Sequence, residues 1–94
     1  MVADVDFDAV TIDADLGTTF RFIGTATKTI TAIQNGVEGK TIRIYGTDIA
    51  SVDLIFADAA TINVASAATL LDATDYLQLT LVDGVWVETG RLIA

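Results

Sequence analysis

The chain has 94 residues, of which 52% are hydrophobic and 19% charged, and its formal net charge is −8. It contains no Cys and no His, so it lacks disulfides, thiolate nucleophiles, imidazole metal ligands and the commonest general base. Five Lys and Arg residues against 13 Asp and Glu residues also argue against nucleic acid and membrane surfaces as partners, because both attract basic proteins.

The first segment alternates acidic and apolar residues. In DVDFDAV, residues 4–10, one face carries Asp4, Asp6 and Asp8, a pattern that predicts a half-buried strand. Like charges along one strand repel, so this face requires water or a basic counter-surface. We therefore predict that these three aspartates bind a partner and that residues 1–15 form an acidic attachment arm.

The same acids match part of a calcium-binding loop. Asp4, Asp6 and Asp8 would take the early ligand positions, and Asp15 would take the last one. However, Ala9 stands where the sharp turn of such a loop needs glycine. The interleaved apolar residues are typical of a strand. We therefore expect a solvated or partner-facing acidic strand and no metal site, with calcium binding as the alternative.

Short runs rich in β-branched and aromatic residues continue along the chain, with Gly, Asn and Asp between them. The main ones are residues 18–24, 28–34, 40–46, 51–58, 60–65 and 77–91. Large apolar residues recur within them at a nearly regular interval: Ile12, Phe22, Ile33, Ile44, Leu54 and Val64. This pattern predicts an all-β protein of about eight strands, as a small sandwich, a barrel or a short β-solenoid. We expect residues 1–94 to form a single domain.

Only one segment has helical spacing. In SAATLLDATDYL, residues 66–77, apolar side chains fall at Ala67, Leu70 and Leu71. The Thr and Asp content fits a loop with one helical turn equally well, so both interpretations remain open.

The last run, LQLTLVDGVWVETGR, predicts a β-hairpin. The dipeptide Asp83-Gly84 favours a type I′ turn. This turn places Leu81 opposite Trp86 on one face and Val82 opposite Val85 on the other. The hairpin is therefore apolar on both faces, and we assign five residues to a core or an oligomer interface: Leu81, Val82, Val85, Trp86 and Val87.

The apolar content is high for one small domain. A chain of this length buries about two thirds of the surface that it exposes when unfolded. The apolar side chains that an ordinary core of this size cannot bury would need an unusually apolar core or a core shared between subunits. We favour an oligomer, since the cores of subunit interfaces are as apolar as domain interiors.

Residues 30–91 carry a longer pattern, which ends in an acidic-glycine turn followed by Trp, Glu and Arg at fixed spacing. Its members are Ile33, Gly36, Glu38, Gly39, Ile42, Ile44, Asp53, Asn63, Leu77, Leu79, Leu81, Asp83, Gly84, Trp86, Glu88 and Arg91. This pattern resembles a segment of bacteriophage virion proteins, chiefly tail fibres, tailspikes and head-attached fibres or decoration proteins. Residues 1–29 lie outside the resemblance.

The resemblance implies a small all-β module, usually trimeric, that builds or decorates a virion and performs no chemistry. We therefore expect a homotrimeric capsid decoration or head-fibre subunit that docks on another virion protein. Its location would be the virion, after assembly in the host cytoplasm. The alternative is a tail-fibre, receptor-binding or adaptor module that contacts a host glycan. Exposure of Trp86, Tyr45 and Tyr76 on one surface would favour this alternative, because aromatic rings stack on sugars.

A pair of carboxylates could also indicate a glycosidase. The candidates are Asp53, Asp58, Asp72 and Asp75. Nothing in the sequence places any two of them at a catalytic separation, and a short chain leaves little room for a substrate cleft. We therefore predict that the protein is not an enzyme and needs no cofactor.

Overall fold

Eleven short strands make up the described part of the protein. The computed structural model describes residues 5–47, 49, 51–64, 68–70, 72 and 74–92. The strands are β1 Val5–Phe7, β2 Thr11–Asp13, β3 Thr19–Phe22, β4 Lys28–Ile30, β5 Ala32–Gln34, β6 Thr41–Tyr45, β7 Leu54–Phe56, β8 Ile62–Asn63, β9 Ala68–Leu70, β10 Tyr76–Val82 and β11 Val85–Leu92. No helix occurs among these residues, which confirms the all-β prediction.

The expected number of about eight strands is too low, because β2 and β9 lie outside the predicted runs and one run contains two strands. The run 28–34 yields β4 and β5, which belong to different sheets. Thr31 lies between them, is exposed, and donates its backbone N–H to the carbonyl of Val10 at 2.8 Å. The chain leaves one sheet and enters the next at this residue.

Six strands form a large sheet in the order β1-β3-β6-β10-β11-β8. β1, β3 and β6 are parallel neighbours, while β10 is antiparallel to both β6 and β11. Alternation in β10 gives the sheet two different faces, since Leu77, Leu79 and Leu81 are buried while Tyr76 and Gln78 are half-buried. One face packs on the core, and the opposite face is called the outer face below.

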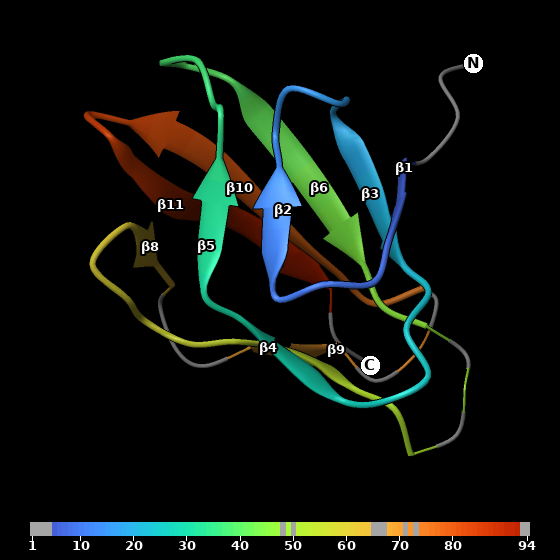
Figure 1. Ribbon diagram of the computed structural model, residues 1–94. Coiled ribbons are helices and arrows are strands. Elements are labelled where there is room, and N and C mark those ends of the chain that lie inside the picture. The colour runs from blue at the N-terminus through green and yellow to red at the C-terminus, as the bar shows by residue number, and fades with distance from the viewer. Residues whose placement is uncertain are drawn as a thin grey trace.

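The other strands form two smaller sheets, β2-β5 and β4-β7-β9. In Figure 1, β2 and β5 lie side by side in front of the large sheet, and β4 and β9 lie below them. The apolar residues that recur along the sequence are all buried in the core: Ile12, Phe22, Ile33, Ile44, Leu54 and Val64. The interval between them therefore marks the points where the chain passes the core.

The C-terminal hairpin confirms the predicted turn and register. Asp83 and Gly84 have φ angles of 55° and 81°, and a type I′ turn requires positive values at both central residues. Leu81 lies opposite Trp86, and Val82 lies opposite Val85.

The helical interpretation of residues 66–77 is wrong for the part of that segment that the structure describes. Ala68–Leu70 is strand β9, antiparallel to β7, and its end residues are fully buried. Further on, the carboxylate of Asp72 accepts the backbone N–H groups of Thr74 at 3.0 Å and Asp75 at 3.2 Å. Asp favours this local turn over a helix because its side chain competes for nearby backbone donors.

Candidate functional site

The predicted acidic arm is only partly free to meet a partner. Asp4 lies outside the described residues. Asp6 and Asp8 are both exposed, and Asp6 lies on β1 opposite Arg21 of β3. The carboxylate of Asp8 forms an ion pair with Lys28 of the same chain, so part of the acidic face already has a basic partner within the protein.

The described carboxylates considered for calcium or catalysis lie in separate parts of the chain, with Asp6 on β1 and the others outside the strands. Among the residues that the structure describes, no three Asp or Glu side chains lie close enough to hold a metal ion. Asp58 accepts the backbone N–H of Val64 at 2.8 Å, and Asp72 accepts those of Thr74 and Asp75. The hydrogen bond from the Thr74 hydroxyl, followed by the one from its backbone, lowers the pKa of Asp72.

The five hairpin residues assigned to a core or interface divide between the two faces. Trp86 is 2% exposed and Leu81 is 9% exposed, so both belong to the core. Val82 is 50% exposed, and Val85 and Val87 are half-buried. Because Val82 lies opposite Val85, and Val87 lies opposite Thr80, all three valines lie on the outer face. We call Val82, Val85 and Val87 the valine patch.

The turn residues of the pattern in residues 30–91 meet at the tip of the hairpin. The carboxylate of Glu38 accepts the backbone N–H of Asp83. The N–H of Gly39 donates to the carbonyl of Leu81 at 2.8 Å. Gly36 packs against the same hairpin, because a Cβ added there would come within 2.8 Å of the Leu81 side chain and would strike the Trp86 ring. The pattern therefore joins two turns that lie far apart in the sequence, which is a structural role.

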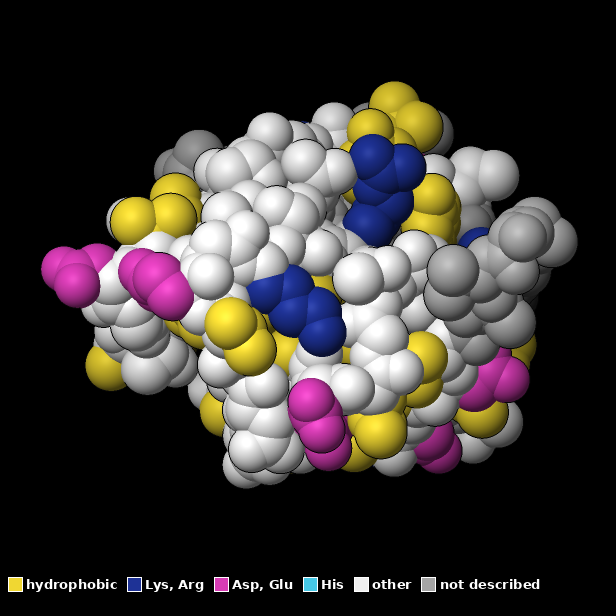
Figure 2. Space-filling view, turned by 90° about the horizontal axis from the view of Figure 1, so that it is seen from above, with side chains coloured by type: hydrophobic (Ala, Val, Ile, Leu, Met, Phe, Trp, Pro, Cys, Tyr) yellow, Lys and Arg dark blue, Asp and Glu magenta, His cyan; other side chains and the backbone are white. Residues whose placement is uncertain are grey.

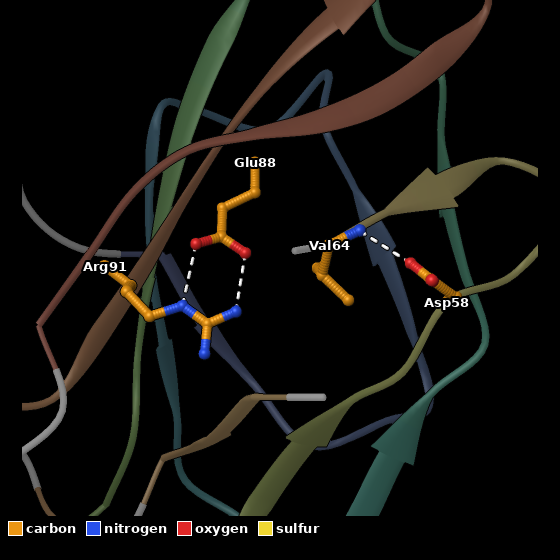
Figure 3. A network of polar contacts seen from close by, with 4 residues as sticks. All are labelled: Asp58, Val64, Glu88 and Arg91. Atoms are coloured by element: carbon orange, nitrogen blue, oxygen red, sulfur yellow. Dashed lines mark hydrogen bonds and ion pairs between the residues drawn. The ribbon is translucent and has the colours of Figure 1, made fainter. Parts of the chain in front are cut away.

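The last two residues of the pattern also bind each other. A bulge in β11 leaves Glu88 opposite Leu79 and Arg91 opposite Leu77, so both charged side chains lie on the inner side. Arg91 donates from Nε and Nη2 to the two carboxylate oxygens of Glu88 at 2.7 and 2.6 Å (Figure 3). This pair of hydrogen bonds to Glu88 raises the pKa of Arg91. Glu88 and Arg91 thus stabilise the end of β11.

The three aromatic residues of the glycan interpretation do not share one surface. Trp86 lies in the core, whereas Tyr45 and Tyr76 lie opposite each other on the outer face, with ring centroids 5.7 Å apart. A guanidinium lies over each tyrosine ring: Arg21 is 4.9 Å from the centroid of Tyr45, and Arg43 is 4.4 Å from that of Tyr76. Each tyrosine ring is therefore in contact with an arginine, and a sugar could stack on the ring only by displacing that guanidinium.

Gln78 completes this group. Its side-chain oxygen accepts a hydrogen bond from Nη2 of Arg43 at 2.9 Å. Arg21 donates to the carbonyl of Gly46 at 3.3 Å, and the hydrogen bond to Tyr45, the largest of the causes, raises the pKa of Arg43. We define the Arg–Tyr cluster as Arg21, Arg43, Tyr45, Tyr76 and Gln78.

A row of hydroxyl groups continues from the cluster toward the valine patch. Thr41 and Thr80 lie opposite each other with their oxygens 2.8 Å apart. The bulge brings the hydroxyl of Thr89 within 3.3 Å of Thr80 and of the Gln78 amide nitrogen. Along the strands, the outer face therefore changes from cationic and aromatic, through neutral polar, to apolar.

Seen from above, cationic side chains lie among hydrophobic and uncharged ones, with carboxylates toward the rim of the view (Figure 2).

Comparison with protein-family models, with curated proteins and with solved structures finds no match. The described part of the chain contains no helix with the length and hydropathy needed to cross a membrane.

Sequence reasoning missed the Arg–Tyr cluster. The five basic residues are scattered along the chain, and only the pairing of β3, β6 and β10 brings Arg21, Arg43 and Tyr76 together. The alternation in KTIRIYG does place Arg43 and Tyr45 on one face of a strand. That signal could have identified two of the five cluster residues.

Proposed function

We propose that this protein is a structural virion protein of a bacteriophage, a capsid decoration or head-fibre subunit that works as a homotrimer. The observation that carries the proposal is the valine patch, an apolar part of the outer face on which Val82 remains half exposed. Apolar surface of this kind marks protein contacts. The resemblance of residues 30–91 to virion segments supplies the context.

The sheet arrangement supports the β-solenoid form of the fold. Three pairs of strands from successive passes of the chain are parallel: β2 with β5, β3 with β6 and β4 with β7. Parallel neighbours of this kind are typical of a chain that coils past the same core repeatedly. In this interpretation the antiparallel pair of β10 and β11 closes the last coil, and the valine patch on its outer face meets the neighbouring subunits.

The alternative of a glycan-stacking tail module receives less support. Exposure of Trp86, Tyr45 and Tyr76 on one surface would favour it, whereas Trp86 is buried and each tyrosine ring has an arginine over it.

Light scattering on the purified protein tests the homotrimer. We expect a mass near three times 9.9 kDa at micromolar concentration. Val82→Asp should dissociate this species, because a buried unpaired carboxylate is costly. Leu16→Asp is the matched control, since Leu16 is 63% exposed in the turn before β3 and should tolerate the same charge. A monomeric wild type, or a Val82→Asp variant that remains trimeric, would contradict the proposed assembly.

A further inference from the structure

The Arg–Tyr cluster and the adjoining threonine row form a polar site that the structural role does not use. We propose that this surface binds a carboxylated saccharide, with Arg43 taking the carboxylate and Gln78, Thr41, Thr80 and Thr89 taking the sugar hydroxyls. The proposal does not depend on the homotrimer, because Arg43, which would take the carboxylate, lies opposite Gln78, beyond the threonine row from the valine patch.

The positive charge of Arg43 favours an anionic group on the ligand. Within the described residues, the Arg43 guanidinium donates a hydrogen bond to the uncharged amide of Gln78, and no carboxylate forms an ion pair with it. The strand register places Asp6 on this face, and Asp6 lies on β1, opposite Arg21 of β3 rather than next to Arg43. The guanidinium of Arg43 therefore meets solvent as a cation on a chain whose net charge is −8, and a bound carboxylate would neutralise it.

The geometry of Arg43 suits a carboxylate in particular. A guanidinium that lies over an aromatic ring keeps its N–H groups at the edge, where two of them can donate in parallel to the two oxygens of a carboxylate. Arg43 lies 4.4 Å from the ring centroid of Tyr76. Tyr76 is therefore a positioning residue, which fixes the orientation of the Arg43 guanidinium in the absence of a ligand.

The neighbouring side chains suit the rest of a saccharide. Thr41, Thr80 and Thr89 form a chain of hydroxyls, with oxygen–oxygen distances of 2.8 and 3.3 Å, that reaches Gln78. Hydroxyl and amide groups both donate and accept hydrogen bonds, as sugar hydroxyls do. An array of this kind can exchange its internal hydrogen bonds for bonds to a polyhydroxylated ligand.

An acidic peptide fits this surface less well. Extended peptides gain affinity by adding their backbone to the free edge of a sheet. The cluster lies on β3, β6 and β10, and each of these strands has a neighbour on both sides. A peptide would have to bind through its side chains alone, on a surface whose apolar part lies at the other end.

Titration calorimetry with three probes tests the site: hexagalacturonate, its fully methyl-esterified form, and hexaglutamate. We expect hexagalacturonate alone to bind the wild type. Arg43→Gln should weaken this binding about tenfold, the usual effect of losing a charge-assisted hydrogen bond. Arg43→Lys should give an intermediate affinity, because lysine keeps the charge without the fork. Lys28→Gln is the matched control, since it removes the same charge from β4 in a different sheet and should bind as the wild type does.

Several results would overturn the proposal. The ester binding as tightly as the acid would remove the role of the carboxylate. Hexaglutamate binding equally well would show a site for acidic peptides. Absence of hexagalacturonate binding at millimolar concentration, or equal affinities of wild type and Arg43→Gln, would show that Arg43 has no ligand of this class. Unchanged thermal unfolding of the variants, followed through Trp86 fluorescence, separates these results from misfolding, and none of them affects the mass measurement that tests the homotrimer.

Discussion

At the scale of single residues, Trp86 connects the hairpin to the core. It lies opposite Leu81 in β10 and pairs with Ile62 of β8, and all three side chains are buried. Two turn residues, Gly36 and Glu38, lie against the same end of the hairpin.

Trp86→Ala should therefore lower the free energy of unfolding by about 3–5 kcal/mol, the usual cost of emptying a buried aromatic site. Urea unfolding followed by circular dichroism provides the measurement, because the variant lacks the fluorescent residue. An unchanged unfolding midpoint would mean that the indole is exposed in solution and would revive sugar stacking.

Gly36→Ala tests the contact between the two turns. A Cβ at this position would lie 2.8 Å from the Leu81 side chain and would strike the Trp86 ring, and neither neighbour can move without disturbing the core. We expect a loss of about 1–3 kcal/mol, as in other overpacked sites. Gly90→Ala is the control, because the nearest atom to its added Cβ, Cβ of Gln78, is 3.7 Å away. Equal stability of the two variants would contradict the close packing at Gly36.

At the scale of elements, the hydrogen bonds that Asp72 accepts from Thr74 and Asp75 lie directly before the start of β10. Asp72 accepts hydrogen bonds from the hydroxyl of Thr74 at 2.8 Å and from the backbone N–H groups of Thr74 and Asp75. These bonds favour the ionised form and lower the pKa of Asp72 below its ordinary value. Its contribution to stability is then complete above the ordinary pKa and is lost as the pH falls through the lowered pKa of the folded state.

Asp72→Asn should remove this pH dependence while keeping an oxygen acceptor in the turn. We expect the variant to be less stable than the wild type at neutral pH, and the difference to shrink as the pH falls below about 4. Thermal unfolding of both proteins across this range measures it. A difference that stays constant with pH would show that the charge of Asp72 plays no part.

Strand β1 carries what remains of the acidic attachment face. Asp8 is paired with Lys28, whereas Asp6 is exposed on the strand. If the arm docks on a basic virion surface, Asp6→Asn should weaken attachment to particles more than Asp8→Asn, and added salt should reduce the difference. Co-sedimentation with particles provides the measurement. Equal attachment of wild type and Asp6→Asn at every salt concentration would mean that the face is merely solvated.

At the scale of the whole molecule, net charge opposes self-association. Each subunit carries −8, so subunits repel one another until contact through apolar surface overcomes the repulsion. The radius of gyration is 11.9 Å, near the roughly 13 Å of a folded domain of about 100 residues. The charges are therefore concentrated on a small surface.

Salt should thus act on assembly and on attachment in opposite directions. Raising the ionic strength from about 0.05 to about 0.5 M shortens the screening length severalfold, which should tighten a homotrimer held by the valine patch. Sedimentation velocity at several protein concentrations measures this effect. A trimer that dissociates as salt rises would instead be held by contacts between opposite charges.

The sequence by itself determined the strand character and one local structure in full. Alternation and the β-branched runs indicated strands, and Asp83-Gly84 fixed both the turn and the register of the hairpin. These features depend on neighbouring residues only: backbone geometry gives strands a period of two, and a type I′ turn requires residues that tolerate positive φ.

Only the tertiary structure decided which strands became neighbours. Arg21 and Tyr45 lie 24 positions apart in the chain, yet they are opposite each other because β3 pairs with β6. In the same way, β1 pairs with β3 and Lys28 forms an ion pair with Asp8. Part of the predicted docking face is therefore already paired within the chain. Pairing between distant strands depends on how the whole core packs, since no local preference distinguishes one exposed strand edge from another. The Arg–Tyr cluster exists for that reason, and no single segment of the sequence encodes it.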